Sequence, residues 1–92
     1  MYTFNGFTEK ANLALNTAIA VASELGHTYI GSEHILYGLC SDENGVASTV
    51  LKKHNVNKEG IYHKLETAIG KGIPTRLTPS DFTPRSKRIL EM

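Results

Sequence analysis

The sequence predicts an all-α fold, a small helical bundle. Apolar residues recur at three- and four-residue steps in four segments, which is the spacing of amphipathic helices. Each segment is closely followed by glycine or asparagine, residues that commonly end helices. No segment has the two-residue alternation that is typical of a half-buried strand. The connections are short, so we expect helices that are neighbours in sequence to pack against each other.

The first helix is predicted between Thr8, whose side chain can cap it, and Gly26, which can adopt the left-handed conformation that closes a helix. Small residues on its apolar face would let a neighbouring helix approach closely. The expected buried stripe comprises Ala11, Ala14, Leu15, Ala18, Ala22 and Leu25.

The second helix is predicted over residues 32–41, after a short tight link. Ser32 is the expected N-cap, and Glu33 would then place a carboxylate at the positive end of the helix dipole. The third helix is expected over residues 46–54 and the fourth between Asn57, a plausible cap, and Gly70. Asn55 is the expected left-handed stop between them. Their apolar stripes comprise Val46, Ala47, Val50 and Leu51, and Ile61, Leu65, Ala68 and Ile69.

Composition indicates an ordinary small domain. The chain has 92 residues, of which 40% are hydrophobic and 21% charged, and its net charge of +1 gives no electrostatic reason to expect nucleic acid. The single cysteine cannot form an internal disulfide, which fits a reducing compartment. The first residues lack the pattern of a signal peptide, and the longest apolar stretch, residues 13–22, is too short to cross a membrane. We therefore expect a cytoplasmic protein with no membrane contact.

The stretch GHTYIGSEHILYGL at residues 26–39 resembles the pattern GHxxIGTEHILLGL of the Clp N-terminal domain, closest to the ClpC type. FTEKA at 7–11 and NGVA at 44–47 are similar to that family's FTERA start and EGVA turn. The resemblance covers essentially the whole chain. It implies a non-catalytic domain, without a cofactor of its own, that binds protein substrates and adaptor proteins. ATPase modules of the same full-length protein would unfold those substrates and pass them to a Clp protease.

An internal repeat accompanies this resemblance. FTPRS at 82–86 echoes FTEKA at 7–11, and the family is built from two such repeats. We interpret residues 1–72 as the first repeat, which should be stable by itself, residues 73–81 as a Pro- and Thr-containing linker, and residues 82–92 as the incomplete start of a second repeat. The apolar residues of that last segment should fold back on the first repeat or form a homodimer. They are Ile89, Leu90 and Met92.

Thr8, Glu33 and Thr83 are the candidate binding residues. A helix start offers free N–H groups to an anion, and a carboxylate can pair with a guanidinium. The resemblance implies that such a Thr and Glu in each repeat hold phosphoarginine on tagged substrates. The alternative is that both threonines are only helix caps and that Glu33 only complements a helix dipole. The acidic partner of Thr83 in the second repeat would fall outside this sequence.

Catalytic and metal sites are less well supported by the residue patterns. Adjacent residues on a helix point about 100° apart, so Ser32, Glu33 and His34 cannot align as a catalytic triad. The spacing of His27, His34 and Cys40 fits no His/Cys zinc pattern. We expect His27 to bond to nearby backbone and Cys40 to be a small buried hydrophobe.

Nucleotide and DNA binding, and a stand-alone adaptor, are the remaining alternatives. GKG at 70–72 lacks the glycine and hydroxyl positions of a phosphate-binding loop. The basic residues are expected to be solvated surface charges, although they leave a small helical DNA-binding domain open. They are Lys52, Lys53, Arg76, Arg85, Lys87 and Arg88. A stand-alone Clp-repeat protein, acting as an adaptor without ATPase modules, is the main alternative to an unfoldase domain.

Overall fold

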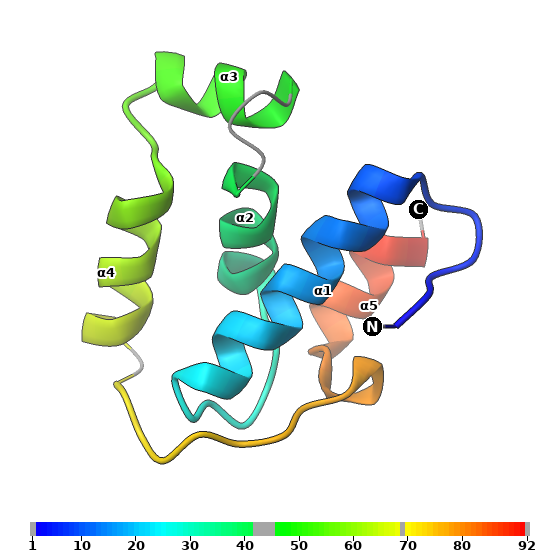
Figure 1. Cartoon of the computed structure of the whole chain (residues 1–92), viewed down its shortest axis with the longest axis vertical. Coiled ribbons are helices and arrows are strands. Elements are labelled where there is room, and N and C mark those ends of the chain that lie inside the picture. Colours follow the sequence, from blue (N-terminus) through cyan, green and yellow to red (C-terminus); the bar gives the residue numbers. More distant parts are fainter. Residues whose placement is uncertain (1, 42–45, 69, 92) are drawn as a thin grey trace.

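The computed structural model describes residues 2–41, 46–68 and 70–91, and the fold within them is all-α (Figure 1), as predicted. The helices are α1 (Glu9–Glu24), α2 (Ser32–Cys40), α3 (Val46–Lys53), α4 (Lys58–Ala68), the 3-10 turn η1 (Pro79–Asp81) and α5 (Pro84–Glu91). Within this described part, no helix is both long and apolar enough to cross a membrane. The expected turn at 42–45 and the side chains of Val46, Ala47, Ala68, Ile69, Ile89, Leu90 and Met92 lie outside it.

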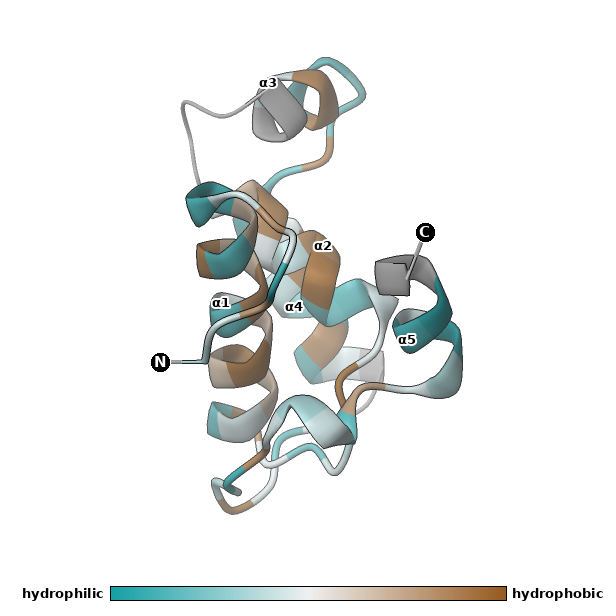
Figure 2. Ribbon diagram, turned by 90° about the vertical axis from the view of Figure 1, so that its right-hand side faces the viewer, coloured by the Kyte–Doolittle hydropathy of each residue, from teal (hydrophilic) through white to brown (hydrophobic). Residues whose placement is uncertain are grey.

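Helix α1 crosses the front of the molecule in Figure 1, with α2 and α4 to its left and α5 behind it to the right, and Figure 2 shows α2 between α1 and α5. Thr8 caps it as predicted, since its Oγ1 accepts a hydrogen bond from the Ala11 N–H at 3.1 Å. Gly26 has the expected positive φ of 74° just after its end. The predicted stripe is buried except for Ala11, which is half-buried, and Ile19 and Val21 are buried as well. α1 therefore contributes to two core clusters rather than to one.

The two clusters divide the core along α1. One contains Leu15, Ala18, Ile19, Ala22, Ile30, Leu77 and Phe82. The other contains Val21, Leu25, Cys40, Ile61 and Leu65. Figure 2 shows the hydrophobic residues of α2 in the middle of the molecule, whereas the described part of α5 is mostly hydrophilic.

Helices α1 and α2 approach so closely that one position excludes a side chain. A Cβ built on Gly38 would collide with the carbonyl oxygen of Ala14. Because that atom belongs to the backbone of α1, it cannot move aside like the end of a flexible side chain. Gly38 therefore sets the distance between the two helices, together with the alanine face of α1.

A hydrogen-bonded relay through two buried histidines fixes the start of α2. The Gly31 N–H donates to His34 Nδ1 at 2.9 Å, so the His34 proton is on Nε2. Nε2 lies 2.8 Å from His27 Nδ1, and His27 Nε2 lies 2.7 Å from the Gly70 carbonyl oxygen. That carbonyl can only accept, so each ring is neutral with its proton on Nε2. We call this chain of groups the histidine relay.

The relay corrects one prediction and supports another. The N-cap of α2 is Gly31, not Ser32, which is the first residue of the helix. His34 supplies the side-chain acceptor that a capping box normally takes from Glu or Gln. His27 does bond to backbone as expected, but its partner Gly70 is distant in sequence.

Residues 70–82 return along α1 instead of leaving the domain (Figure 1). The Gly72 N–H donates to the Leu25 carbonyl and the Thr75 N–H to the Ser23 carbonyl, both at 2.8 Å. Leu77 and Phe82 are only 7% and 4% exposed. The segment expected to be a linker thus contributes Leu77 to the core, and the stability of residues 1–72 by themselves stays a prediction.

Helix α5 folds back on the rest of the chain. Ile30 and Phe82 form an isolated parallel bridge, and Ser86 is fully buried. Pro84 occupies the first helical position as predicted. The fold-back accounts for α5 within one chain, and a homodimer through residues 82–92 stays a prediction.

We predict that Phe82→Ala destabilises the domain by about 3 kcal/mol, because it removes a buried ring and leaves a cavity in the core. Urea unfolding followed by circular dichroism measures this loss. Arg88→Ala is the matched control on an exposed position of α5 and should change stability by less than about 0.5 kcal/mol. Equal unfolding midpoints for Phe82→Ala and wild type would show that this segment does not belong to the core.

We also predict that the melting temperature falls as the pH is lowered from 6.5 to 5. Burial, and then the nearby His27, lower the pKa of His34 from 6.5 to about 4. The unfolded chain therefore binds more protons than the folded one across this window, so stability rises with pH there. A melting temperature that is flat across this window, or that rises toward pH 5, would contradict a neutral relay.

Candidate binding site

The N-termini of α2 and α5 meet at one edge of the molecule. The Ile30 N–H donates to the Asp81 carbonyl and the Thr83 N–H donates to the Ile30 carbonyl, both at 2.9 Å. Helix α2 starts two residues after Ile30, and α5 starts directly after Thr83. The positive ends of two helix dipoles therefore lie close together, which favours negative charge between them.

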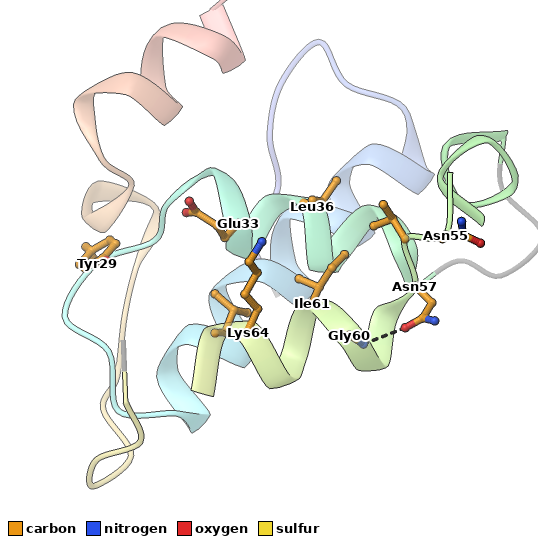
Figure 3. Close-up of a pocket in the computed structure, with 10 residues that line it drawn as sticks. Tyr29, Glu33, Leu36, Asn55, Asn57, Gly60, Ile61 and Lys64 are labelled. Carbon is orange, nitrogen blue, oxygen red and sulfur yellow. Dashed lines mark hydrogen bonds between the residues drawn. The ribbon is translucent and has the colours of Figure 1, made fainter. Parts of the chain in front are cut away.

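Glu33 lies in the first turn of α2 and is exposed. Its Oε2 is 3.2 Å from the position that a Cβ on Gly31 would occupy, and the ring of Tyr29 is 3.3 Å from that same position. The carboxylate and the ring thus lie close together over the Gly31 backbone, where no side chain intervenes. Figure 3 shows the carboxylate directed toward the side of Tyr29 and away from Ile61. A guanidinium bound by Glu33 would therefore be near an aromatic ring.

Thr83 caps α5 on the neighbouring side of this site. Its Oγ1 accepts from the Ser86 N–H at 3.1 Å and lies 2.9 Å from the Ser86 hydroxyl, to which it can donate. An anion arriving at the start of α5 would compete with Ser86 for the Thr83 hydroxyl proton. Arg85, in the first turn of the same helix, is exposed and carries a second donor group.

Thr8 lies at a different helix start from Glu33 and Thr83. The His27–His34 contact places the first turn of α2 beside the end of α1, whereas Thr8 precedes the start of α1. The 16 residues of α1 span roughly 24 Å at 1.5 Å per residue. The structure therefore brings the start of α5 beside the first turn of α2, and it places the start of α1, which follows Thr8, at the other end of that helix (Figure 1).

A cavity of about 590 Å³ opens beside Glu33, between α2 and α4 (Figure 3). Sequence reasoning missed both the cavity and the position of Tyr29 on its rim. The only signal in the sequence was the apolar stripes of the two helices that form its walls. The residues that line the cavity are Tyr29, Glu33, Leu36, Asn55, Val56, Asn57, Gly60, Ile61, Lys64 and Leu65.

The other candidate groups have structural roles. Both ring nitrogens of His34 are bonded within the relay, so neither activates Ser32. His27 and His34 do meet, but no third His, Cys, Asp or Glu joins them to form a possible metal site in the described part of the chain. Cys40 is buried as expected, which raises the pKa of its thiol. In the GKG stretch at 70–72, the Gly70 carbonyl is held by His27.

Known proteins similar to this chain agree on one family. A family profile described as the Clp repeat (R) N-terminal domain matches residues 6–92. An ATP-dependent Clp protease ATP-binding subunit ClpA homolog from Porphyra purpurea is 42% identical over 97% of this chain. The chaperone protein ClpC1, chloroplastic, from Oryza sativa subsp. japonica is 39% identical over the same share.

These relatives are far longer than the chain, which covers 11% of the Porphyra protein and 10% of the rice protein. The aligned region is nevertheless nearly all of the present sequence, and it includes both helix starts that form the candidate site. The chain therefore belongs to the Clp repeat N-terminal domain family.

Proposed function

We propose that this domain binds protein substrates and adaptor proteins for a ClpC-like ATP-dependent unfoldase that feeds a Clp protease. Relatives named as ATP-binding subunits of the Clp protease support this reading. Their much greater length also favours it over a stand-alone adaptor. In this proposal the domain binds and does not catalyse, and it contains no cofactor of its own. The ATPase modules would belong to the same full-length protein, in the cytoplasm or, as for the chloroplastic relatives, in a plastid.

The ligand we propose for the site is phosphoarginine on a tagged substrate. The observation that carries this proposal is the hydrogen bond from the Thr83 N–H to the Ile30 carbonyl, because it brings a helix start next to Glu33. Glu33 would accept the N–H donors of the guanidinium. The phosphate would lie at the start of α5, near Arg85 and the Thr83 hydroxyl, where the helix dipole favours its charge.

Thr8 takes a different place in this proposal from the one expected from the sequence. It opens a helix of its own and would belong to a second, equivalent site. Residues 82–86 echo residues 7–11 at an offset of 75 positions. The acidic partner of that site, the equivalent of Glu33, would therefore fall at position 108, outside these 92 residues. We therefore expect one equivalent of phosphoarginine per chain of this length.

We predict that Glu33→Ala weakens phosphoarginine binding by about 1.5–3 kcal/mol, the range for a hydrogen bond to a charged group. Thr83→Ala should also weaken binding, and both losses can be measured by calorimetric titration of free phosphoarginine. Phosphoserine should bind poorly to the wild type, because it carries a phosphate without a guanidinium.

Thr8→Ala is the matched control for Thr83→Ala, since both remove the cap of a helix. It should destabilise the domain by about 1 kcal/mol and leave phosphoarginine affinity unchanged. If the wild-type protein binds no phosphoarginine, the proposed ligand is wrong. If Thr8→Ala rather than Thr83→Ala abolished binding, the pairing of Glu33 with Thr83 would be wrong.

A further inference from the structure

The cavity between α2 and α4 is apolar at its floor and open at its mouth. Ile61 and Leu65 of α4 are 8% and 3% exposed and form part of a core cluster. Leu36 and Val56 are only half-buried and pack against the same cluster. With a volume of about 590 Å³, the cavity is within the size range of small-ligand sites. Apolar walls of this kind suit an apolar group of a ligand.

The cavity is continuous with the proposed phosphoarginine site. Glu33 and Tyr29 line it, although the Glu33 carboxylate is directed to the side of Tyr29 and away from Ile61 (Figure 3). Any peptide whose arginine is paired with Glu33 must therefore start at the rim of the cavity.

The spacing between the two sites matches an extended peptide. Leu36 follows Glu33 by three residues on α2, which is about 4.5 Å along the helix axis. An extended chain advances about 3.3 Å per residue. A side chain one or two positions away from the arginine would therefore reach the apolar part of the cavity.

The charges at the cavity also favour one kind of ligand. Lys64 lines it from α4, and its side chain extends toward the same region as Glu33 (Figure 3). An ammonium group there can donate to a peptide carbonyl or to an acidic side chain, and it repels a second basic residue. Together, Glu33 and Lys64 favour a single arginine without another cation beside it.

We infer that the α2–α4 cavity binds a large apolar side chain that lies one or two positions from the arginine in the same substrate peptide. This inference rests on the proposed function of Glu33 and adds a sequence preference to it. The domain would then select, among arginine-phosphorylated segments, those that are apolar around the arginine. Such segments are normally buried, so the preference would direct the domain toward unfolded chains.

The test compares two short peptides that each contain one phosphoarginine, flanked on both sides by Leu in one and by Ser in the other. We expect the wild type to bind the Leu-flanked peptide about tenfold more tightly, the scale of burying part of one or two leucines. Free phosphoarginine is titrated alongside as the probe for the Glu33 site alone.

Gly60→Leu is designed to fill the cavity without removing a core residue. Gly60 lines the cavity, and the nearest atom to an added Cβ is the end of the Asn57 side chain, Oδ1, at 3.1 Å. Leucine is also a better helix former than glycine. His63→Leu adds the same side chain to an exposed position of α4 that does not line the cavity, and serves as the control.

Gly60→Leu should bring the affinities for the two peptides to within about twofold of each other and leave the affinity for free phosphoarginine unchanged. His63→Leu should retain the tenfold preference for the Leu-flanked peptide. Leu36→Ser, which makes the cavity wall polar, should reduce the preference as well. If the wild type binds free phosphoarginine but treats both peptides equally, the inference is wrong and the proposed function stands. If the wild type binds neither free phosphoarginine nor the peptides, both are wrong.

Discussion

The histidine relay is the interaction on which the rest of the arrangement depends. It joins three parts of the chain that are separate in sequence: the residues after α1, the first turn of α2 and the residues after α4. Only neutral rings satisfy the Gly31 N–H at one end and the Gly70 carbonyl at the other. A protonated His34 would direct a second N–H at the N–H of Gly31 and lose that bond. The relay thus fixes the position of the first turn of α2. Glu33 precedes His34 by one residue in that turn, so the relay also fixes the backbone position of Glu33.

The C-terminal segment depends on contacts that require glycine. Gly26 has φ of 74°, and a Cβ there would lie 2.5 Å from the carbonyl oxygen of Ile73 and 2.6 Å from the carbonyl carbon of Gly72. The backbone of residues 72–75 can therefore run directly against the end of α1. With the backbone in this position, Leu77 and Phe82 pack into the core. The bridge between Phe82 and Ile30 then places the start of α5 beside α2. The candidate site is a consequence of this packing, because the packing places the two helix starts side by side.

The local features of the fold could be predicted from the sequence, whereas its long-range contacts could not. Thr8 as a cap and Asn55 as a left-handed stop, with φ of 62°, were predicted because each follows from a residue and its immediate neighbours. Ser32 was wrongly expected to cap α2, because a histidine one turn along is not a standard capping partner. The contact between Ile30 and Phe82 joins segments far apart in the chain, and no local pattern indicates it. For that reason the sequence suggested Thr8 and Glu33 as one site, whereas in the structure it is the start of α5, after Thr83, that lies beside the first turn of α2.

The burial of Phe82 next to Thr83 links the candidate site to the integrity of the fold. Thr83 is bonded through its N–H to Ile30, and Ile30 is itself fully buried in the same core cluster as Phe82. A group that bridges Glu33 and the start of α5 would therefore connect two elements that the core already holds together. A ligand of this kind would require both elements in place, so it would bind the folded chain and not the unfolded one and would add to stability by mass action. Residues 77–86 thus contribute Leu77, Phe82 and Ser86 to the buried interior and Thr83 and Arg85 to the candidate site. For this reason the candidate site cannot be separated from the fold.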